Sequence, residues 1–145
     1  MDKLRIEDII AEKGQYVSTS AGVSMFPMLR NRRDTVVIRP VNGRLKKYDV
    51  PLYRRKSDGA YVLHRIIEVR DDSYVIRGDN CFNKEYGIED SQIIGILSEF
   101  YRGNRHVLCD SRGFRIYSRF AVAIHPLQMI FMRIYLYVKR ILKHK

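Results

Sequence analysis

Turn-forming residues divide the middle of the chain into short β-prone segments, and this spacing constrains the possible folds more than any other feature. Between residues 35 and 101, runs rich in Val, Ile and Tyr are repeatedly interrupted by Pro, Gly, Asp and Asn. Closely spaced turns favour antiparallel strands over strand–helix–strand units, so we predict a mainly β fold, a coiled all-β barrel or sandwich. The predicted strands cover residues 35–39, 49–54, 60–69, 74–77, 93–101 and 106–109.

Helical patterns flank the β region on both sides. Apolar residues at helical spacing predict a short amphipathic helix over residues 4–13, which Gly14 ends. Near the other end of the chain, Pro126 suits the start of a second helix in which apolar residues again recur at helical spacing. We therefore expect one domain over residues 1–110, which includes the N-terminal helix, and a basic amphipathic helical tail over residues 111–145.

The positive charge of the chain belongs to its tail. Of the net charge of +11, eight units lie after Asp110, and no acidic residue follows that position. Because a basic amphipathic helix binds anionic lipid headgroups, we expect a peripheral, membrane-associated protein whose tail lies on an anionic membrane surface. His125, Gln128 and Arg133 interrupt the apolar run and argue against a membrane-spanning helix, while apolar residues on the cationic side argue against a nucleic-acid partner. A helix that packs on the body and exposes its basic side is the alternative.

The N-terminus and the cysteines indicate a cytoplasmic protein without a metal. The first residues carry mixed charges and lack the apolar segment of a secretory signal. Cys81 and Cys109 have neither metal-binding nor redox spacing, and the four histidines show no metal-ligand spacing. We therefore expect free thiols in a reducing compartment, with one disulfide as the alternative if the domain is exported, and we expect no metal or organic cofactor.

Three separate segments carry side chains that suit nucleophilic acyl transfer. Ser24 lies in a Gly-Val-Ser-Met-Phe-Pro segment, His64 precedes an arginine in a β-prone segment, and Asp79 lies in a Gly-Asp-Asn tripeptide. A serine hydroxyl needs a nearby base at neutral pH, and an imidazole, with an ordinary pKa of about 6.5, can be that base. Each segment also has a purely structural explanation: a buried turn serine, a histidine that only packs in a strand, and an Asx turn that closes a hairpin.

The order and surroundings of these residues resemble the signal peptidase I superfamily, the S24/S26 serine peptidases. The resemblance covers about residues 17–101 and includes the Ser-Met-x-Pro tetrapeptide at Ser24, an aspartate before a valine-rich strand at Asp34, and the Gly-Asp-Asn tripeptide. A histidine at position 64, where many members carry lysine, resembles the endoplasmic-reticulum, archaeal and sporulation-type branch. The resemblance implies a barrel of the signal peptidase and self-cleaving repressor type.

The same resemblance implies catalytic roles. Ser24 would attack the scissile carbonyl, and His64 would take the proton and give it to the leaving amine. Asp79 would orient His64, while Glu85 stands where histidine-type members often carry a further aspartate, so either acid could complete the triad and both are expected to be needed. Gly22 replaces a serine that gives many signal peptidases a second oxyanion donor, which leaves only the Ser24 backbone N–H identified.

The sequence therefore predicts a serine endopeptidase that cleaves a precursor protein or a signal or leader peptide. A catalytically inactive barrel that binds peptides or membranes is the alternative from another functional class, and the departures at Gly22 and Glu85 support it. Self-cleavage is disfavoured, because only about 20 residues precede Ser24.

Overall fold

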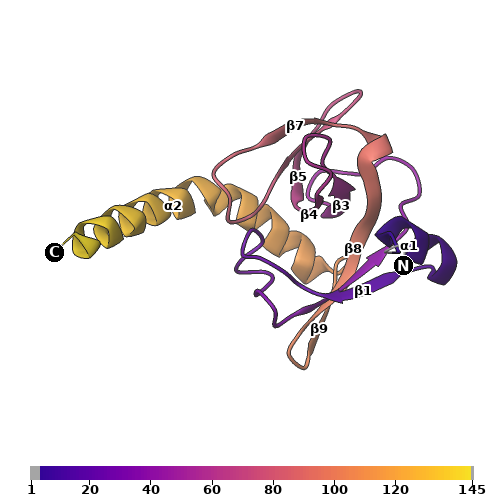
Figure 1. Ribbon diagram of the computed structural model, residues 1–145, viewed down its shortest axis with the longest axis horizontal. Helices are drawn as coiled ribbons and strands as arrows, with labels where there is room; N and C mark the ends of the chain where they lie inside the picture. The colour runs from indigo at the N-terminus through magenta and orange to yellow at the C-terminus, as the bar shows by residue number, and fades with distance from the viewer. Residues whose placement is uncertain (1–3, 145) are drawn as a thin grey trace.

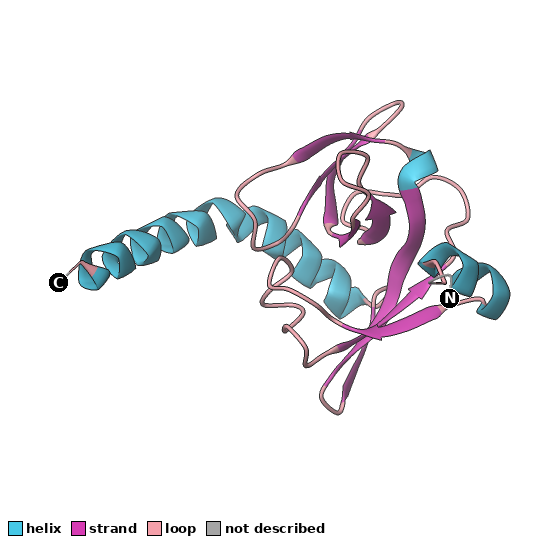
Figure 2. Cartoon of the chain, viewed as in Figure 1, coloured by secondary structure: helices cyan, strands magenta, loops and turns pink. Residues whose placement is uncertain are grey.

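The computed structural model describes residues 4–144, and it consists of a mainly β body with a helix at each end (Figures 1 and 2). Met1 to Lys3 and Lys145, which enter the charge and signal-segment arguments above, lie outside the described residues. The elements in chain order are α1 (Ile6–Lys13), β1 (Tyr16–Thr19), β2 (Thr35–Arg39), β3 (Pro51–Arg54), β4 (Tyr61–Leu63), β5 (Arg65–Val69), β6 (Tyr74–Arg77), β7 (Glu85–Ile88), the 3₁₀ turn η1 (Asp90–Gln92), β8 (Ile93–Arg102), β9 (Arg105–Leu108) and α2 (Arg112–Lys143).

Two antiparallel sheets make up the body. The larger sheet has the strand order β1-β2-β8-β3-β4, with β9 also paired to β8, and the smaller sheet has the order β5-β6-β7. Shifts in register between β2 and β8 and between β3 and β8 interrupt regular pairing, and such irregularities bend and twist a strand. The larger sheet curls into a half-barrel, so the expectation of a mainly β, coiled antiparallel fold is confirmed. Within residues 4–144, the strands β1 and β4 at the two ends of this order each have one unpaired edge.

The strand predicted over residues 60–69 is divided in two. The backbone leaves the larger sheet after Leu63 and enters the smaller sheet at Arg65, and His64 lies at the crossing. The prediction of one continuous strand was wrong because the β-prone composition of this segment does not change where the pairing partner changes. The strand β7 was not predicted at all, since it contains Gly87 at a φ of +68°, which is unfavourable in a strand.

Buried apolar side chains form two clusters, one for each sheet. The first lines the concave side of the larger sheet and includes Ile10 from α1, Met25 and Leu29 beside Ser24, and Phe114 from α2. The second lies between β3 and the smaller sheet. Burying one side chain of this size contributes roughly 1.5–3 kcal/mol, so the residues around Ser24 are firmly anchored.

The C-terminal helix differs most from expectation. It begins at Arg112, where the Ser111 side chain caps it by accepting a hydrogen bond from Phe114 N, so the predicted start at Pro126 was wrong. Pro126 lies inside the helix, which continues past it and projects from the body (Figure 1). The early turns bury Phe114 and Ser118 against the body, and this packing stabilises the part of the helix that precedes Pro126.

The polar residues along α2 do not break its apolar run. The helix is long and apolar enough to cross a membrane by length and composition, and only 11% of its most apolar stretch is buried. It is therefore a long, mostly exposed apolar helix, which is compatible with membrane association.

Candidate active site

The turn between β1 and β2 carries Ser24 and is fixed from two directions. The side chains of Met25 and Leu29, each 4% exposed, anchor the turn in the first cluster of buried apolar side chains. The loop that follows β6 also holds the turn, through two hydrogen bonds from Asn80. The Asn80 backbone N–H donates to Ser24 O over 2.8 Å, and the side-chain Nδ2 donates to Val23 O over 3.1 Å. The nucleophile candidate therefore sits on a turn whose backbone is held by a second, distant segment.

His64 is buried at the crossing between the two sheets and approaches the Ser24 turn across a glycine. A Cβ added to Gly78 would lie 3.1 Å from His64 Nε2 and 2.7 Å from Ser24 O. Only a residue without a side chain allows these two segments to come so close. Within residues 4–144, the Ser24 hydroxyl makes no direct hydrogen bond to His64, although both side chains line the same cleft.

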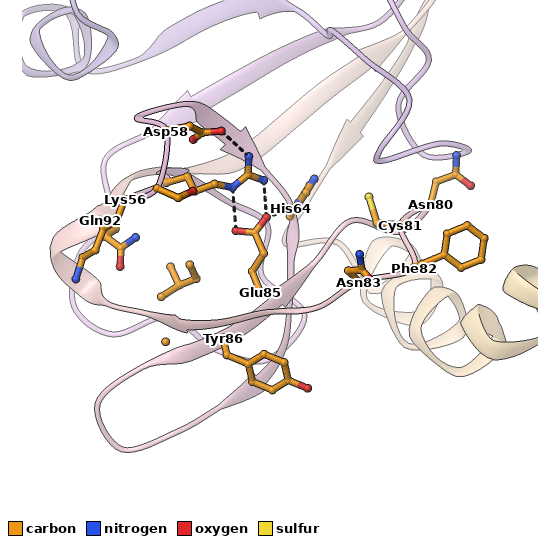
Figure 3. A pocket seen from close by; sticks show the side chains of 14 residues that line it. Lys56, Asp58, His64, Asn80, Cys81, Phe82, Asn83, Glu85, Tyr86 and Gln92 are labelled. Atoms are coloured by element: carbon orange, nitrogen blue, oxygen red, sulfur yellow. Dashed lines mark hydrogen bonds and ion pairs between the residues drawn. The ribbon is translucent and has the colours of Figure 1, made fainter.

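The other ring nitrogen of His64 faces Glu85. His64 Nδ1 lies 3.9 Å from Glu85 Oε1 and 3.5 Å from the Tyr53 hydroxyl, and Figure 3 shows His64 and Glu85 side by side. The imidazole thus stands between a carboxylate on one side and the Ser24 turn on the other. This is the order that a serine, histidine and acid triad requires.

Asp79 has a different partner. Both of its carboxylate oxygens accept 2.8 Å hydrogen bonds from Arg65, which is fully buried. Arg65 also donates to Ser118 Oγ on α2 over 2.6 Å. Sequence reasoning left open which acid serves His64; the geometry brings Glu85 to Nδ1 and commits Asp79 to a buried ion pair.

Arg55 holds the Glu85 carboxylate in place. Its Nη2 and Nε donate to the two oxygens of Glu85 over 2.5 and 3.3 Å, and its Nη1 reaches Asp58 over 3.3 Å (dashed lines in Figure 3). The contact between Arg55 and Glu85 could not be predicted from the sequence, because the two residues lie 30 positions apart in the chain. Asn80, in contrast, adjoins Asp79 in the Gly-Asp-Asn tripeptide, and that tripeptide was the signal that could have identified it.

The electrostatic surroundings favour a neutral imidazole beside an ionised carboxylate. Burial lowers the pKa of His64, and the Arg55 cation lowers it further, against the opposing influence of Glu85 and Asp79. Burial raises the pKa of Glu85, but the hydrogen bonds and charge of Arg55 outweigh it and hold that pKa below its usual range. At neutral pH, His64 can therefore accept a proton, and Glu85 can stabilise the resulting cation.

A cleft of about 400 Å³ opens in front of Ser24 and His64. Residues of β1 and β4 form its two walls, and buried apolar side chains, among them Met25 and Leu52, form its floor. A second cavity of about 900 Å³ lies on the Glu85 side of His64 and is the one drawn in Figure 3. His64 and Arg55 line both cavities, whereas Ser24 lines only the first cleft of the two.

Two backbone N–H groups near Ser24 differ in whether they are free to donate to an oxyanion. The Gly22 N–H already donates to the Asn31 side chain over 2.8 Å. In the part of the chain that the structure describes, the Ser24 N–H has no protein acceptor. One free donor is therefore available at the nucleophile itself.

The described residues contain no group of three or more His, Cys, Asp or Glu side chains that could hold a metal ion, and both cysteines are free thiols. The arrangement of Ser24, His64 and Glu85 is suited to proton transfer and nucleophilic attack by protein side chains. Comparison of the chain with protein-family models, with curated proteins and with solved structures found no match to any of them.

Proposed function

We propose that this protein is a serine endopeptidase of the signal-peptidase-like class that cleaves a precursor protein or a signal or leader peptide. The observation that carries the proposal is the position of His64, with Nδ1 facing Glu85 and Nε2 facing the Ser24 turn across Gly78. An S24/S26-type barrel is the fold that goes with it, and the curled antiparallel half-barrel supports that assignment.

In the proposed reaction, Ser24 Oγ attacks the scissile carbonyl while His64 Nε2 takes its proton. The negative charge on the carbonyl oxygen is stabilised by the Ser24 N–H, and the imidazolium by Glu85. The C–N bond then breaks as His64 gives its proton to the leaving amine. Water, deprotonated by His64, hydrolyses the acyl-serine and restores the hydroxyl. Because Ser24 Oγ, among the described residues, makes no hydrogen bond to His64 in the free protein, substrate binding must rotate Ser24 Oγ toward His64. Catalytic hydrogen bonds often tighten in this way only in the substrate complex.

The substrate would bind as an extended strand. The cleft lies between the unpaired edges of β1 and β4, and an extended peptide can pair with such edges through its own backbone. Alternate side chains of the peptide would then point to the apolar floor. The limited volume of the cleft favours small side chains before the scissile bond.

The helix α2 would attach the protein peripherally to an anionic membrane surface. Its basic residues attract anionic headgroups, and its apolar side chains enter the lipid interface. The exposed apolar side chains are Ile116, Phe120, Leu127, Ile130, Phe131, Ile134, Leu136, Val138, Ile141 and Leu142.

The test compares the wild type with Ser24→Ala on a precursor that carries a signal peptide, with products identified by mass spectrometry. Ser91→Ala, an exposed serine on η1, is the matched control. We expect cleavage by the wild type and the control and none by Ser24→Ala. Equal processing by wild type and Ser24→Ala, or no processing by either, supports an inactive peptide- or membrane-binding barrel instead.

A further inference from the structure

We propose that His125 and Gln128 of α2 are positioning residues for Ser24, so that the C-terminal helix is a working part of the active site. This inference rests on the proposed peptidase function. It concerns a segment that the resemblance to signal peptidases does not cover.

Two polar side chains of α2 hold the loop that follows β6. His125, which is 5% exposed, donates from Nε2 to Cys81 O over 2.7 Å. Gln128, three residues further along the helix, donates from Nε2 to Asn80 Oδ1 over 3.2 Å. Residues three apart lie on the same face of a helix, so one face of α2 binds two consecutive residues of this loop.

The same loop holds the nucleophile turn. Asn80 accepts from Gln128 with its side-chain oxygen and donates to Val23 O with its side-chain nitrogen, while its backbone N–H donates to Ser24 O. A short relay of hydrogen bonds therefore runs from the helix through one asparagine to the serine. Fixing Asn80 from the helix side also fixes the orientation of its amide, on which the bond to Val23 depends.

A third hydrogen bond to the site comes from the same face of α2. Ser118 Oγ accepts from Arg65, the partner of Asp79, over 2.6 Å. Positions 118, 125 and 128 recur at helical spacing and so share one face. Polar side chains at these positions cost desolvation energy that apolar packing would avoid, and each recovers it through a directed bond to the site. Simple packing of α2 on the body would not require them.

Removing these bonds is expected to lower kcat more than it affects KM. The walls of the cleft belong to β1 and β4, so substrate binding does not depend on α2. The position of Ser24 relative to His64, in contrast, depends on α2. A displacement of about 1 Å between these two side chains can cost roughly 100-fold in rate. We expect His125→Leu and Gln128→Leu each to reduce kcat about 10- to 100-fold with little change in KM.

The experiment uses the full-length protein and the precursor substrate. His125→Gln, which keeps a side-chain donor, should retain more activity than His125→Leu. Ala123→Ser, at an exposed position of the same stretch that belongs neither to the site nor to the membrane-binding side chains, is the matched control and should keep wild-type kcat. The pH at which activity falls should not move in any of them, because His64 and Glu85 are untouched. Melting temperatures are recorded so that a loss of folding is recognised.

A double-mutant cycle tests the route through Asn80. If Gln128 acts through Asn80, then Gln128→Leu adds little to the loss already caused by Asn80→Ala. Additive losses, wild-type kcat in both His125→Leu and Gln128→Leu, or an equal loss in the Ala123 control would overturn the inference. Equal processing by wild type and Ser24→Ala would instead remove the peptidase proposal on which it rests.

Discussion

At the scale of single residues, the close approach of Ser24 and His64 depends on Gly78. An added Cβ would lie 2.6 Å from Cys81 Sγ, 2.7 Å from Ser24 O and 3.1 Å from His64 Nε2. The Ser24 carbonyl is backbone and cannot swing aside as the end of a long side chain could. A single methyl group added at position 78 would therefore push the Ser24 turn and His64 apart.

We predict that Gly78→Ala abolishes measurable cleavage and lowers the free energy of unfolding by roughly 1–3 kcal/mol. Gly113→Ala is the matched control, because a Cβ there meets nothing within 4 Å and alanine favours a helix by up to about 1 kcal/mol. Urea unfolding and precursor cleavage check both variants. Full activity in Gly78→Ala would contradict the proposed contact between the two segments.

The ionisation of His64 predicts the acidic limb of the pH profile. Because burial lowers the pKa of His64 from 6.5, kcat/KM should fall only as the pH drops below 6.5. Glu85 raises that pKa, so Glu85→Gln should move the limb to a still lower pH while it reduces kcat roughly 100- to 10,000-fold. Rates measured from pH 4.5 to 8 check this, and a limb that moves to higher pH in Glu85→Gln would contradict the assigned contact.

At the scale of elements, the sequence specified strand positions better than strand partners. Turn residues bounded β2, β6 and β8 correctly, but the change of sheet at His64 follows from long-range pairing that no local pattern encodes. That change of sheet turns His64 toward Glu85 on β7, a strand that local composition did not reveal. The four candidate residues could thus be named from the sequence, whereas the separate places of Asp79 and Glu85 could not.

The ion pair between Arg65 and Asp79 joins β5 to the loop after β6, and we predict that its loss is chiefly structural. Asp79→Asn leaves the fully buried Arg65 without its counter-charge, which typically costs about 3–5 kcal/mol. Asp58→Asn, which removes a carboxylate that is 53% exposed in its pair with Arg55, should cost much less. Urea unfolding of both variants measures the difference, and an Asp79→Asn protein as stable as the control would refute it.

At the scale of the whole molecule, α2 joins the body that carries the candidate site to an apolar and basic surface. We predict that the protein pellets with vesicles of anionic lipid, less with neutral vesicles, and less at high salt. Ile134→Glu, on the exposed part of the helix, should weaken pelleting, while Leu4→Glu, an exposed apolar position ahead of α1, should not. Retention in the membrane after alkaline extraction would indicate a spanning helix instead of peripheral attachment.

Under the proposed peptidase function, the unpaired edges of β1 and β4 restrict which polypeptides can be cut. With only four residues in β1 and three in β4, the groove can accept a polypeptide only where that polypeptide is locally unravelled and has free main-chain amides and carbonyls. A stretch already committed to its own helix or sheet would be spared whatever its side chains. Selectivity would therefore depend on timing, with newly made or unfolded chains being cut and mature ones surviving.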